Sequence, residues 1–381
     1  MERKNMDNQK WICAHAAAQY ESVPQLRPGV GDRTIRADIM LGKSGSALRL
    51  VLGDLYGDKE AIYGKASVEV GGKSYILTGN HEERIIVRPH SLWQSDPVPC
   101  EVRSGDVMTL SLYLESENGP VGESIVPAWH SAKGEFTEEE FVPEKCGMFT
   151  DDERLRGYVR TEVLSDEGTE IAAVLGDSIT AMELWTKHVQ KAWAASGDRY
   201  ELLNMGISGN RLLRDTSLPQ VQGIQVFGQS GLKRLTGDIL SLPGIKTAVV
   251  ALGVNDISQP GGEEGMSPPI EELVSVQELK DGFLSVIRAC HERGIETVGC
   301  TITPFGGFGT YSPEREDIRL EINEWILHSG SFDRSIDFAS AVSDPQNPAR
   351  MAVRFDSGDH LHPGEEGGRA MAELFLKCME K

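Results

Sequence analysis

Apolar and polar residues alternate with a period of two in the first part of the chain. In the segment 107–114 one face collects four apolar side chains, Met108, Leu110, Leu112 and Leu114. Shorter apolar segments at 48–52 and 66–70 are bounded by Gly- and Asp-containing turns. Several short strands separated by such turns are typical of an all-β sandwich. We therefore predict a β-sandwich domain of jelly-roll-like type over residues 1–165.

The pattern changes after residue 165, where short apolar segments begin to alternate with amphipathic helical segments. This alternation predicts parallel strands joined by helices. Five strands are expected, at 171–175, 201–203, 247–252, 295–302 and 335–338. Four helices are expected, at 184–195, 277–293, 313–328 and 364–380. We predict a three-layer α/β/α, flavodoxin-like domain with a parallel sheet over residues 166–381, after a linker at 165–170.

Two of these helices have clear sequence boundaries. The helix at 277–293 ends at Gly294, and one of its faces carries Leu279, Phe283, Val286 and Cys290. The helix at 313–328 opens with Ser312 as the cap and Pro313 at its first position. We expect that helix to bury Ile318, Ile322, Trp325 and Ile326.

Length, composition and charge narrow the function classes. The chain has 381 residues, 39% of them hydrophobic and 25% charged, which suits two globular domains. Its 38 basic and 58 acidic residues give a net charge of −20. Such a surface repels nucleic-acid backbones and anionic membranes. We therefore expect no nucleic-acid partner and no membrane partner, while oligomeric state is not readable.

The cysteines and the N-terminus bear on the compartment. None of the six cysteines forms a CxxC pair, so neither a zinc knuckle nor a redox motif is suggested. Cys290, Cys300 and Cys378 fall on apolar positions, which favours buried free thiols. The first ten residues are polar and no apolar signal segment follows them. The expected location is the cytoplasm.

The first of four chemically unusual segments follows the predicted strand 171–175. It reads Gly-Asp-Ser-Ile-Thr and places Ser178 at a strand-to-helix turn. A serine there exposes its hydroxyl, and its N–H lies at a helix N-terminus, where it can stabilise an oxyanion. The alternative interpretation is that Ser178 only caps the helix.

The second and third segments follow the next two strands. At 204–210, Gly206 and Gly209 let backbone approach a ligand closely, although they are also common turn residues. A dinucleotide fingerprint would need glycine at position 204, which is asparagine. At 253–256, Asn255 offers a side-chain N–H to an oxyanion, or else forms an Asx-turn. Its neighbour Asp256 is interpreted as a loop-stabilising carboxylate.

The fourth segment, 356–363, lies just before the last helix. Asp359 and His362 are three residues apart, so in a tight turn the carboxylate can orient the imidazole. His360 and His362 also have the spacing of a metal pair. No third ligand with suitable spacing is evident, so no metal and no cofactor is expected.

Together these four segments are similar to the blocks of the SGNH/GDSL hydrolases, a family of serine esterases. The resemblance covers residues 166–381. It implies Ser178 as nucleophile, Asp359 and His362 as its triad partners, and an oxyanion hole formed by Ser178, Gly209 and Asn255. The whole chain also resembles a subgroup of bacterial SGNH esterases with an N-terminal β-sandwich. The matching stretches include 95–98, 110–114, 303–305 and 357–363.

The resemblance implies hydrolysis of short-acyl esters, with a small-molecule or oligosaccharide ester as the partner. Acetyl esters on carbohydrates are expected because the loops at 259–264 and 305–309 are rich in Gly, Pro and acidic residues. A lysophospholipase or thioesterase would need an apolar trough for a long chain. An acyltransferase shares the same acyl-enzyme and is left open. A carbohydrate-binding protein with a degenerate hydrolase domain conflicts with four intact segments.

Overall fold

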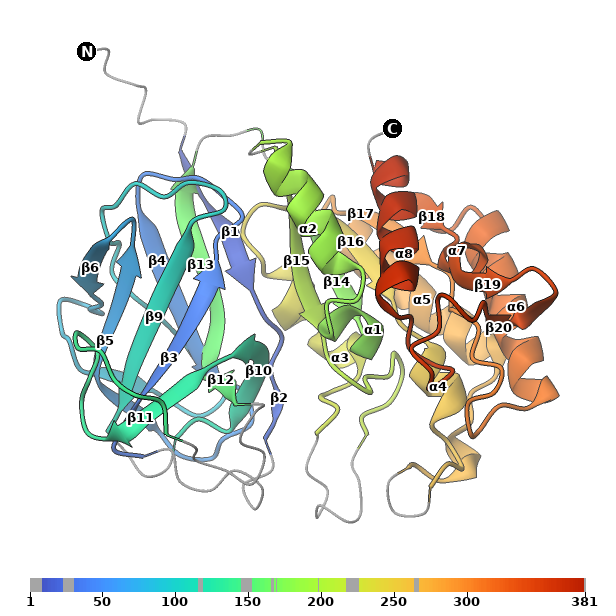
Figure 1. Ribbon diagram of the computed structural model, residues 1–381, viewed down its shortest axis with the longest axis horizontal. Coiled ribbons are helices and arrows are strands. Elements are labelled where there is room, and N and C mark those ends of the chain that lie inside the picture. Colours follow the sequence, from blue (N-terminus) through green and yellow to red (C-terminus); the bar gives the residue numbers. More distant parts are fainter. Residues whose placement is uncertain are drawn as a thin grey trace. The chain divides into compact units, whose positions relative to one another are not determined.

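The computed structural model describes residues 9–22, 31–115, 119–144, 153–165, 168, 170–197, 199–216, 226–263 and 267–379 (Figure 1). The chain forms two units, one of Met1–Thr169 with Ser196–Glu201 and one of Glu170–Ala195 with Leu202–Lys381. Part of the expected linker, at 166, 167 and 169, lies outside the described residues. The boundary after residue 165 stays a prediction.

The first unit is built from antiparallel strands. They are β1 (Lys10–Ala16), β2 (Tyr20–Glu21), β3 (Arg33–Met40), β4 (Leu48–Asp54), β5 (Ala61–Val70), β6 (Lys73–Ile76), β7 (Ile85–Val87), β8 (Ser91–Gln94), β9 (Val107–Leu114), β10 (Gly122–Pro127), β11 (Trp129–Lys133), β12 (Arg154–Arg156) and β13 (Tyr158–Ser165). Two larger sheets have the orders β1-β13-β4-β8 and β11-β3-β9-β5-β6, and a small one the order β12-β10-β2. Figure 1 shows the two larger sheets as facing layers, as the predicted sandwich requires.

The period-two alternation determines which face of β9 is buried. All four apolar residues predicted to share a face, Met108, Leu110, Leu112 and Leu114, are fully buried. Their partners across β3 include Ile35 and Ile39, which are also buried. A shift by one residue would expose this whole set, so the register is strongly specified. The predicted strand at 66–70 is the end of the longer β5, and Gly71 and Gly72 turn the chain into β6.

The second unit contains the predicted parallel sheet. Its strands are β14 (Glu170–Gly176), β15 (Tyr200–Gly206), β16 (Ile245–Ala251), β17 (Glu296–Cys300) and β18 (Arg334–Ile336). Their order is β15-β14-β16-β17-β18, which is 2-1-3-4-5 along the chain and confirms the flavodoxin-like prediction. A short hairpin of β19 (Ser343–Asp344) and β20 (Asn347–Met351) precedes the last helix.

Helices cover both faces of this sheet (Figure 1). They are α1 (Ser178–Ala181), α2 (Thr186–Ala195), α3 (Gly231–Leu235), the π-helical η3 (Thr236–Leu240), α4 (Val254–Ser258), the 3-10 turn η4 (Ile270–Glu272), α5 (Val276–His291), α6 (Pro313–His328), α7 (Phe338–Val342) and α8 (Glu365–Met379). On one face, Trp185 packs against Phe338 of α7 and Phe375 of α8. On the other, Phe283 of α5 stacks with Trp325 of α6.

The predicted face of α5 is confirmed, because its four apolar residues are all buried. Ser275 and Glu278 form a reciprocal capping box that satisfies two orphan N–H groups at its start. The prediction for α6 was partly wrong. Ile322 and Ile326 are buried, but Ile318 and Trp325 are only half-buried, and the buried face also holds Arg315, Glu316, Arg319 and Asn323. These polar groups are buried because they bind backbone carbonyls, carboxylates and N–H groups in their neighbourhood.

The strand predicted at 335–338 was too long. It ends at Ile336, and Asp337 then caps α7 by accepting the N–H of Ser340. The described cysteines are free thiols, with Cys290 and Cys300 buried and Cys378 half-buried, while Cys146 lies outside the described residues. In the described part of the chain no helix is long and apolar enough to cross a membrane. The cytoplasmic location stays a prediction.

Candidate active site

Ser178 is the first residue of α1, immediately after the buried strand β14. The side chain of Asp177 accepts the N–H of Ile179 at 3.0 Å, so Asp177 is the N-cap of α1. The alternative interpretation of Ser178 as the cap is therefore wrong. At the first helical position its own N–H has no carbonyl within the helix to bind, and this donor is left for another acceptor.

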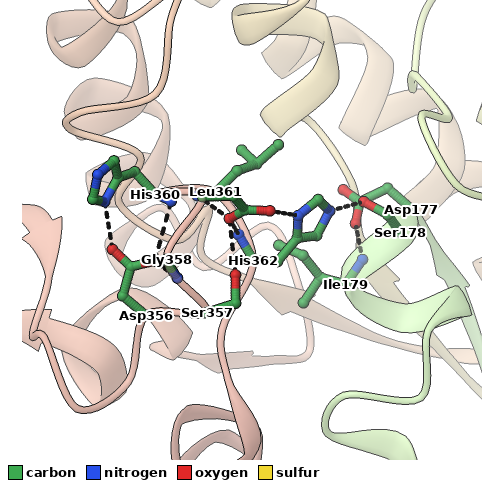
Figure 2. Close-up of polar contacts among 10 residues, drawn as sticks. Asp177, Ser178, Ile179, Asp356, Ser357, Gly358, His360, Leu361 and His362 are labelled. Carbon is green, nitrogen blue, oxygen red and sulfur yellow. Dashed lines mark hydrogen bonds and ion pairs between the residues drawn. The ribbon is translucent and has the colours of Figure 1, made fainter.

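The side chains of Ser178, His362 and Asp359 form one hydrogen-bonded chain, and Figure 2 shows His362 pointing toward Ser178. Ser178 Oγ lies 2.8 Å from His362 Nε2, and His362 Nδ1 lies 2.6 Å from Asp359 Oδ2. An ionised carboxylate only accepts hydrogen bonds, so Nδ1 carries the proton and Nε2 is the acceptor for the serine hydroxyl. This is the arrangement in which an imidazole can remove the proton of a serine.

Asp359 is held by the turn that it belongs to. Its Oδ1 accepts the N–H of Leu361 at 2.9 Å, the N–H of His362 at 2.8 Å and the hydroxyl of Ser357 at 3.0 Å. Partial burial raises the pKa of Asp359, but the hydrogen bonds from His362 and Leu361 outweigh burial and hold that pKa well below its usual range. The carboxylate therefore stays ionised, which the orientation of His362 requires.

A second Asp–His pair lies in the same turn. His360 Nδ1 is 2.6 Å from Asp356 Oδ2, yet Figure 2 shows the ring of His360 turned away from Ser178 and that of His362 turned toward it. Each histidine has its own carboxylate, so the two do not face a common ion. Among the described residues no three His, Cys, Asp or Glu side chains are grouped as a metal site.

Glycines bring the end of β15 close to the serine turn. A Cβ at Gly206 would lie 2.4 Å from the N of Ala181, so only glycine permits this approach to α1. Gly209 has φ +72°, and a Cβ there would lie 2.5 Å from the ring of Phe227. Both the positive φ and the lack of space for a Cβ therefore require glycine at position 209. Its backbone is not covered by a side chain of the same residue.

Asn255 lies in α4, directly after β16. It is 4% exposed, and its Nδ2 donates to the carbonyl of Asn210 at 3.0 Å, which joins the third segment to the second. The neighbouring Asp256 accepts the N–H groups of Leu212 at 2.7 Å and Leu213 at 3.0 Å. This agrees with its interpretation as a loop-stabilising carboxylate.

Arg234, a buried residue of α3 that no sequence motif marks, connects these segments. Its guanidinium donates to the carbonyls of Gly176 at 2.8 Å and Met205 at 2.7 Å, at the ends of two adjacent strands. It also binds Asn210 Oδ1 at 3.0 Å and forms a buried ion pair with Asp238 at 2.9 Å. Loss of Arg234 would therefore remove a hydrogen-bond donor from several buried acceptors at once.

A cavity of about 30 Å³ lies behind the serine turn. Its lining includes Asp177, Ile179 and Thr180 but neither Ser178 nor His362. This cavity is therefore not the place where a substrate would meet Ser178.

Asp177 makes the stability of the site dependent on pH. Burial raises the pKa of Asp177 to about 7, although the N–H of Ile179 partly counters this. Because this folded-state pKa is above the ordinary value of about 3.9, the stabilisation from the protonated group is complete below about pH 4. It is lost as the pH rises through about 7.

We therefore expect Asp177→Asn to flatten the decline of Tm between about pH 4 and 8 and to raise Tm above wild type at pH 8. The asparagine oxygen can still accept the N–H of Ile179, so the cap is retained. Thermal unfolding over this pH range checks the prediction, with the exposed Asp317→Asn as control. Parallel Tm curves for wild type and Asp177→Asn would contradict it.

Comparisons with known proteins identify the second unit's relatives. The sequence profile of the GDSL-like lipase/acylhydrolase family matches residues 174–370, which include all four segments. No curated protein matches the chain in sequence. Similar solved structures include a GDSL-like lipase from Bacteroides thetaiotaomicron, with 15% identity and a TM-score of 0.40 over 56% of this chain and 89% of the lipase.

Two further solved structures are similar over the same extent. An acetyl xylan esterase variant from Geobacillus stearothermophilus has 16% identity and a TM-score of 0.40, covering 55% of this chain and 94% of the esterase. A psychrotrophic esterase from Pseudoalteromonas has 15% identity and a TM-score of 0.39, covering 55% of this chain and 97% of the esterase.

Proposed function

The chain belongs to the GDSL-like lipase/acylhydrolase family and is a carboxylic ester hydrolase, and from this we propose that it hydrolyses short-acyl esters through an acyl-enzyme on Ser178. The observation that carries the proposal is the hydrogen-bonded chain from Ser178 through His362 to Asp359. Three groups at the proper separations supply a nucleophile, a base and the carboxylate that orients the base.

In the first half of the reaction, Ser178 Oγ attacks the ester carbonyl while His362 Nε2 takes the hydroxyl proton. The carbonyl oxygen becomes an oxyanion in a tetrahedral intermediate. The intermediate collapses when the bond to the alcohol oxygen breaks and His362 returns its proton to that oxygen. Asp359 stabilises the imidazolium throughout and keeps its ring in the reactive orientation.

Three N–H groups are proposed to bind the oxyanion: the backbone N–H of Ser178, the backbone N–H of Gly209 and one N–H of the Asn255 amide. The first belongs to a helix N-terminus, and the second to a left-handed glycine. The third is available because an amide nitrogen carries two hydrogens and Asn210 takes only one of them. Such preorganised donors favour the transition state over the ground state.

In the second half, water attacks the acyl carbon while His362 again acts as the base. The oxyanion forms in the same place, and its collapse releases the carboxylic acid and restores the hydroxyl of Ser178. No step requires a cofactor or a metal ion. An alcohol in place of water would give acyl transfer, which shares the first half of the reaction.

We propose acetyl esters, on carbohydrates, as the substrate class. A long acyl chain gains about 0.8 kcal/mol per buried CH₂ group, and it therefore needs an apolar trough. In the loop 305–309 the exposed residues are Gly307 and Gly309, and in the loop after α4 they are Gly261 and Glu263. These surfaces offer little apolar area to a chain. Glu264, part of the same predicted polar loop, lies outside the described residues.

The substrate proposal is tested with p-nitrophenyl acetate, butyrate and octanoate and with acetylated xylo-oligosaccharides. We expect kcat/KM to fall as the acyl chain lengthens and acetate to be released from the oligosaccharides. A preference for octanoate would favour a lysophospholipase or thioesterase instead. Product analysis in the presence of a competing alcohol separates hydrolysis from transfer.

For the oxyanion site, we expect Asn255→Ala to lower kcat by about 10²- to 10³-fold and to change KM little. The reason is that the oxyanion exists only in the transition state, so the lost donor does not weaken substrate binding. Steady-state kinetics on p-nitrophenyl acetate measures the split, with the exposed Asn347→Ala as control. An unchanged kcat would remove Asn255 from the oxyanion site.

A further inference from the structure

Gln259, which follows α4, touches both segments that flank the proposed oxyanion site. Its Nε2 donates to the carbonyl of Gly209 at 2.8 Å and to Asn255 Oδ1 at 3.2 Å. We propose that Gln259 is a positioning residue that sets the distance and orientation of these two oxyanion donors. The inference rests on the proposed function and assigns a role to a residue outside its four motif segments.

The orientation of the Gln259 amide is determined by its neighbours. Both groups that face its nitrogen, the Gly209 carbonyl and Asn255 Oδ1, accept hydrogen bonds, so an amide oxygen in that place would be repelled. Its own Oε1 is buried and has no donor within the part of the chain that the structure describes. All the polar contacts of this amide therefore come from Nε2, and they go to the oxyanion segments.

These contacts determine which way the Asn255 amide points. Gln259 donates to its oxygen, and the carbonyl of Asn210 accepts from its nitrogen at 3.0 Å. If the amide were flipped, its nitrogen would face the donor on Gln259 and its oxygen would face the carbonyl of Asn210. Only one orientation satisfies both neighbours, and that orientation keeps the second N–H of Asn255 for the oxyanion.

The backbone around Gln259 is itself held firmly, so its side chain can act as a fixed reference. Its N–H donates to the carbonyl of Asn255 at 3.1 Å. The buried guanidinium of Arg315 and the hydroxyl of Thr310 hold the neighbouring carbonyls, which are those of Ile257, Ser258 and Pro260. A shift of the backbone at Gln259 would therefore require these contacts to break.

Gln259 also spans two separate elements. Gly209 follows β15, whereas Asn255 belongs to α4 after β16, and these strands are not adjacent in the sheet. Because the amide nitrogen of Gln259 binds both segments, the distance between Gly209 and Asn255 depends on this contact between loops. It is not set by direct pairing of their two strands. A misplacement of about 1 Å can cost a catalytic site about 10²-fold in rate, so small adjustments here are consequential.

The test is Gln259→Met, which keeps the side-chain length and removes both N–H donors. We expect kcat on p-nitrophenyl acetate to fall by about 10-fold or more, but by no more than the loss expected when an oxyanion donor is removed altogether. We expect KM to change by less than about twofold. In the Asn255→Ala background the same change should cost less than it does in the wild type, because one of the two donors that Gln259 positions is already absent. Gln259→Glu, which places an acceptor against two acceptors, should cost more than Gln259→Met.

The control is Gln277→Met, the same change at an exposed residue of α5 whose amide binds Asp281. Tm and circular dichroism of every variant establish that the fold is retained. If Gln259→Met leaves kcat unchanged, changes KM alone, or costs the same in both backgrounds, the positioning role is wrong. Ser178→Ala is assayed alongside, because full activity in that variant would overturn the proposed function itself rather than the role of Gln259 alone.

Discussion

Replacing Ser178 with alanine is expected to lower kcat for p-nitrophenyl acetate by about 10⁶-fold. The substitution removes the only atom to which the acyl group can be attached in the proposed mechanism. It should leave the fold intact, because Asp177 rather than Ser178 caps α1. Steady-state kinetics with Tm as the folding check measures the effect.

A matched serine controls for the loss of a hydroxyl in general. Ser241 is exposed and its Oγ donates to the carbonyl of Gly237 within the same turn, so Ser241→Ala should retain wild-type rates. Acyl-enzyme formation can be followed directly by mass spectrometry after brief exposure to substrate. Residual activity of Ser178→Ala near the wild-type level would show that another group attacks the ester.

Replacing Asp359 with asparagine is expected to lower kcat by about 10³-fold. The asparagine nitrogen would face His362 Nδ1 as a donor and would force the proton onto Nε2, so the imidazole could no longer accept the proton of Ser178. A buried triad carboxylate costs about 10⁴-fold when changed in this way. The side chain of Asp359 is 49% exposed, so solvent screens it and the expected loss is smaller.

The second Asp–His pair provides the control for this prediction. In both pairs the histidine Nδ1 lies 2.6 Å from the aspartate Oδ2. The ring of His360, however, is turned away from Ser178. Asp356→Asn should therefore retain activity to within about tenfold, with any loss arising from the turn that both pairs share. Equal losses in the two variants would mean that the turn, and not the orientation of His362, limits the reaction. A pH–rate profile of each variant distinguishes the two explanations.

The four segments meet because of how a parallel sheet is built. The carboxyl ends of its strands lie at one edge, and chemistry collects where the strand order reverses. Here that place is between β14 and β16, which begin the two branches of the 2-1-3-4-5 order. Ser178 follows the first of these strands and Asn255 the second. The turn with Asp359 and His362 then reaches the same edge from the start of α8.

The sequence alone determined the parts that depend on local pattern. Period-two alternation identified β9 and its buried face, and helical periodicity identified α5 with all four of its buried apolar residues. Both follow from short-range geometry, in which a residue's face depends only on its place in its own element. The serine turn and the Asp359–His362 spacing were readable for the same reason, since each lies within a few residues of chain.

Only the tertiary structure decided which polar groups are buried and what they bind. Periodicity predicted an apolar face for α6, yet Arg315 and Arg319 are buried there. Arg234 and Gln259 gave no sequence signal at all, although Arg234 binds the carbonyls of two separate strands and Gln259 binds the carbonyl of the distant Gly209. A long polar side chain is buried only where acceptors from other parts of the chain converge on it, and no local pattern records that convergence.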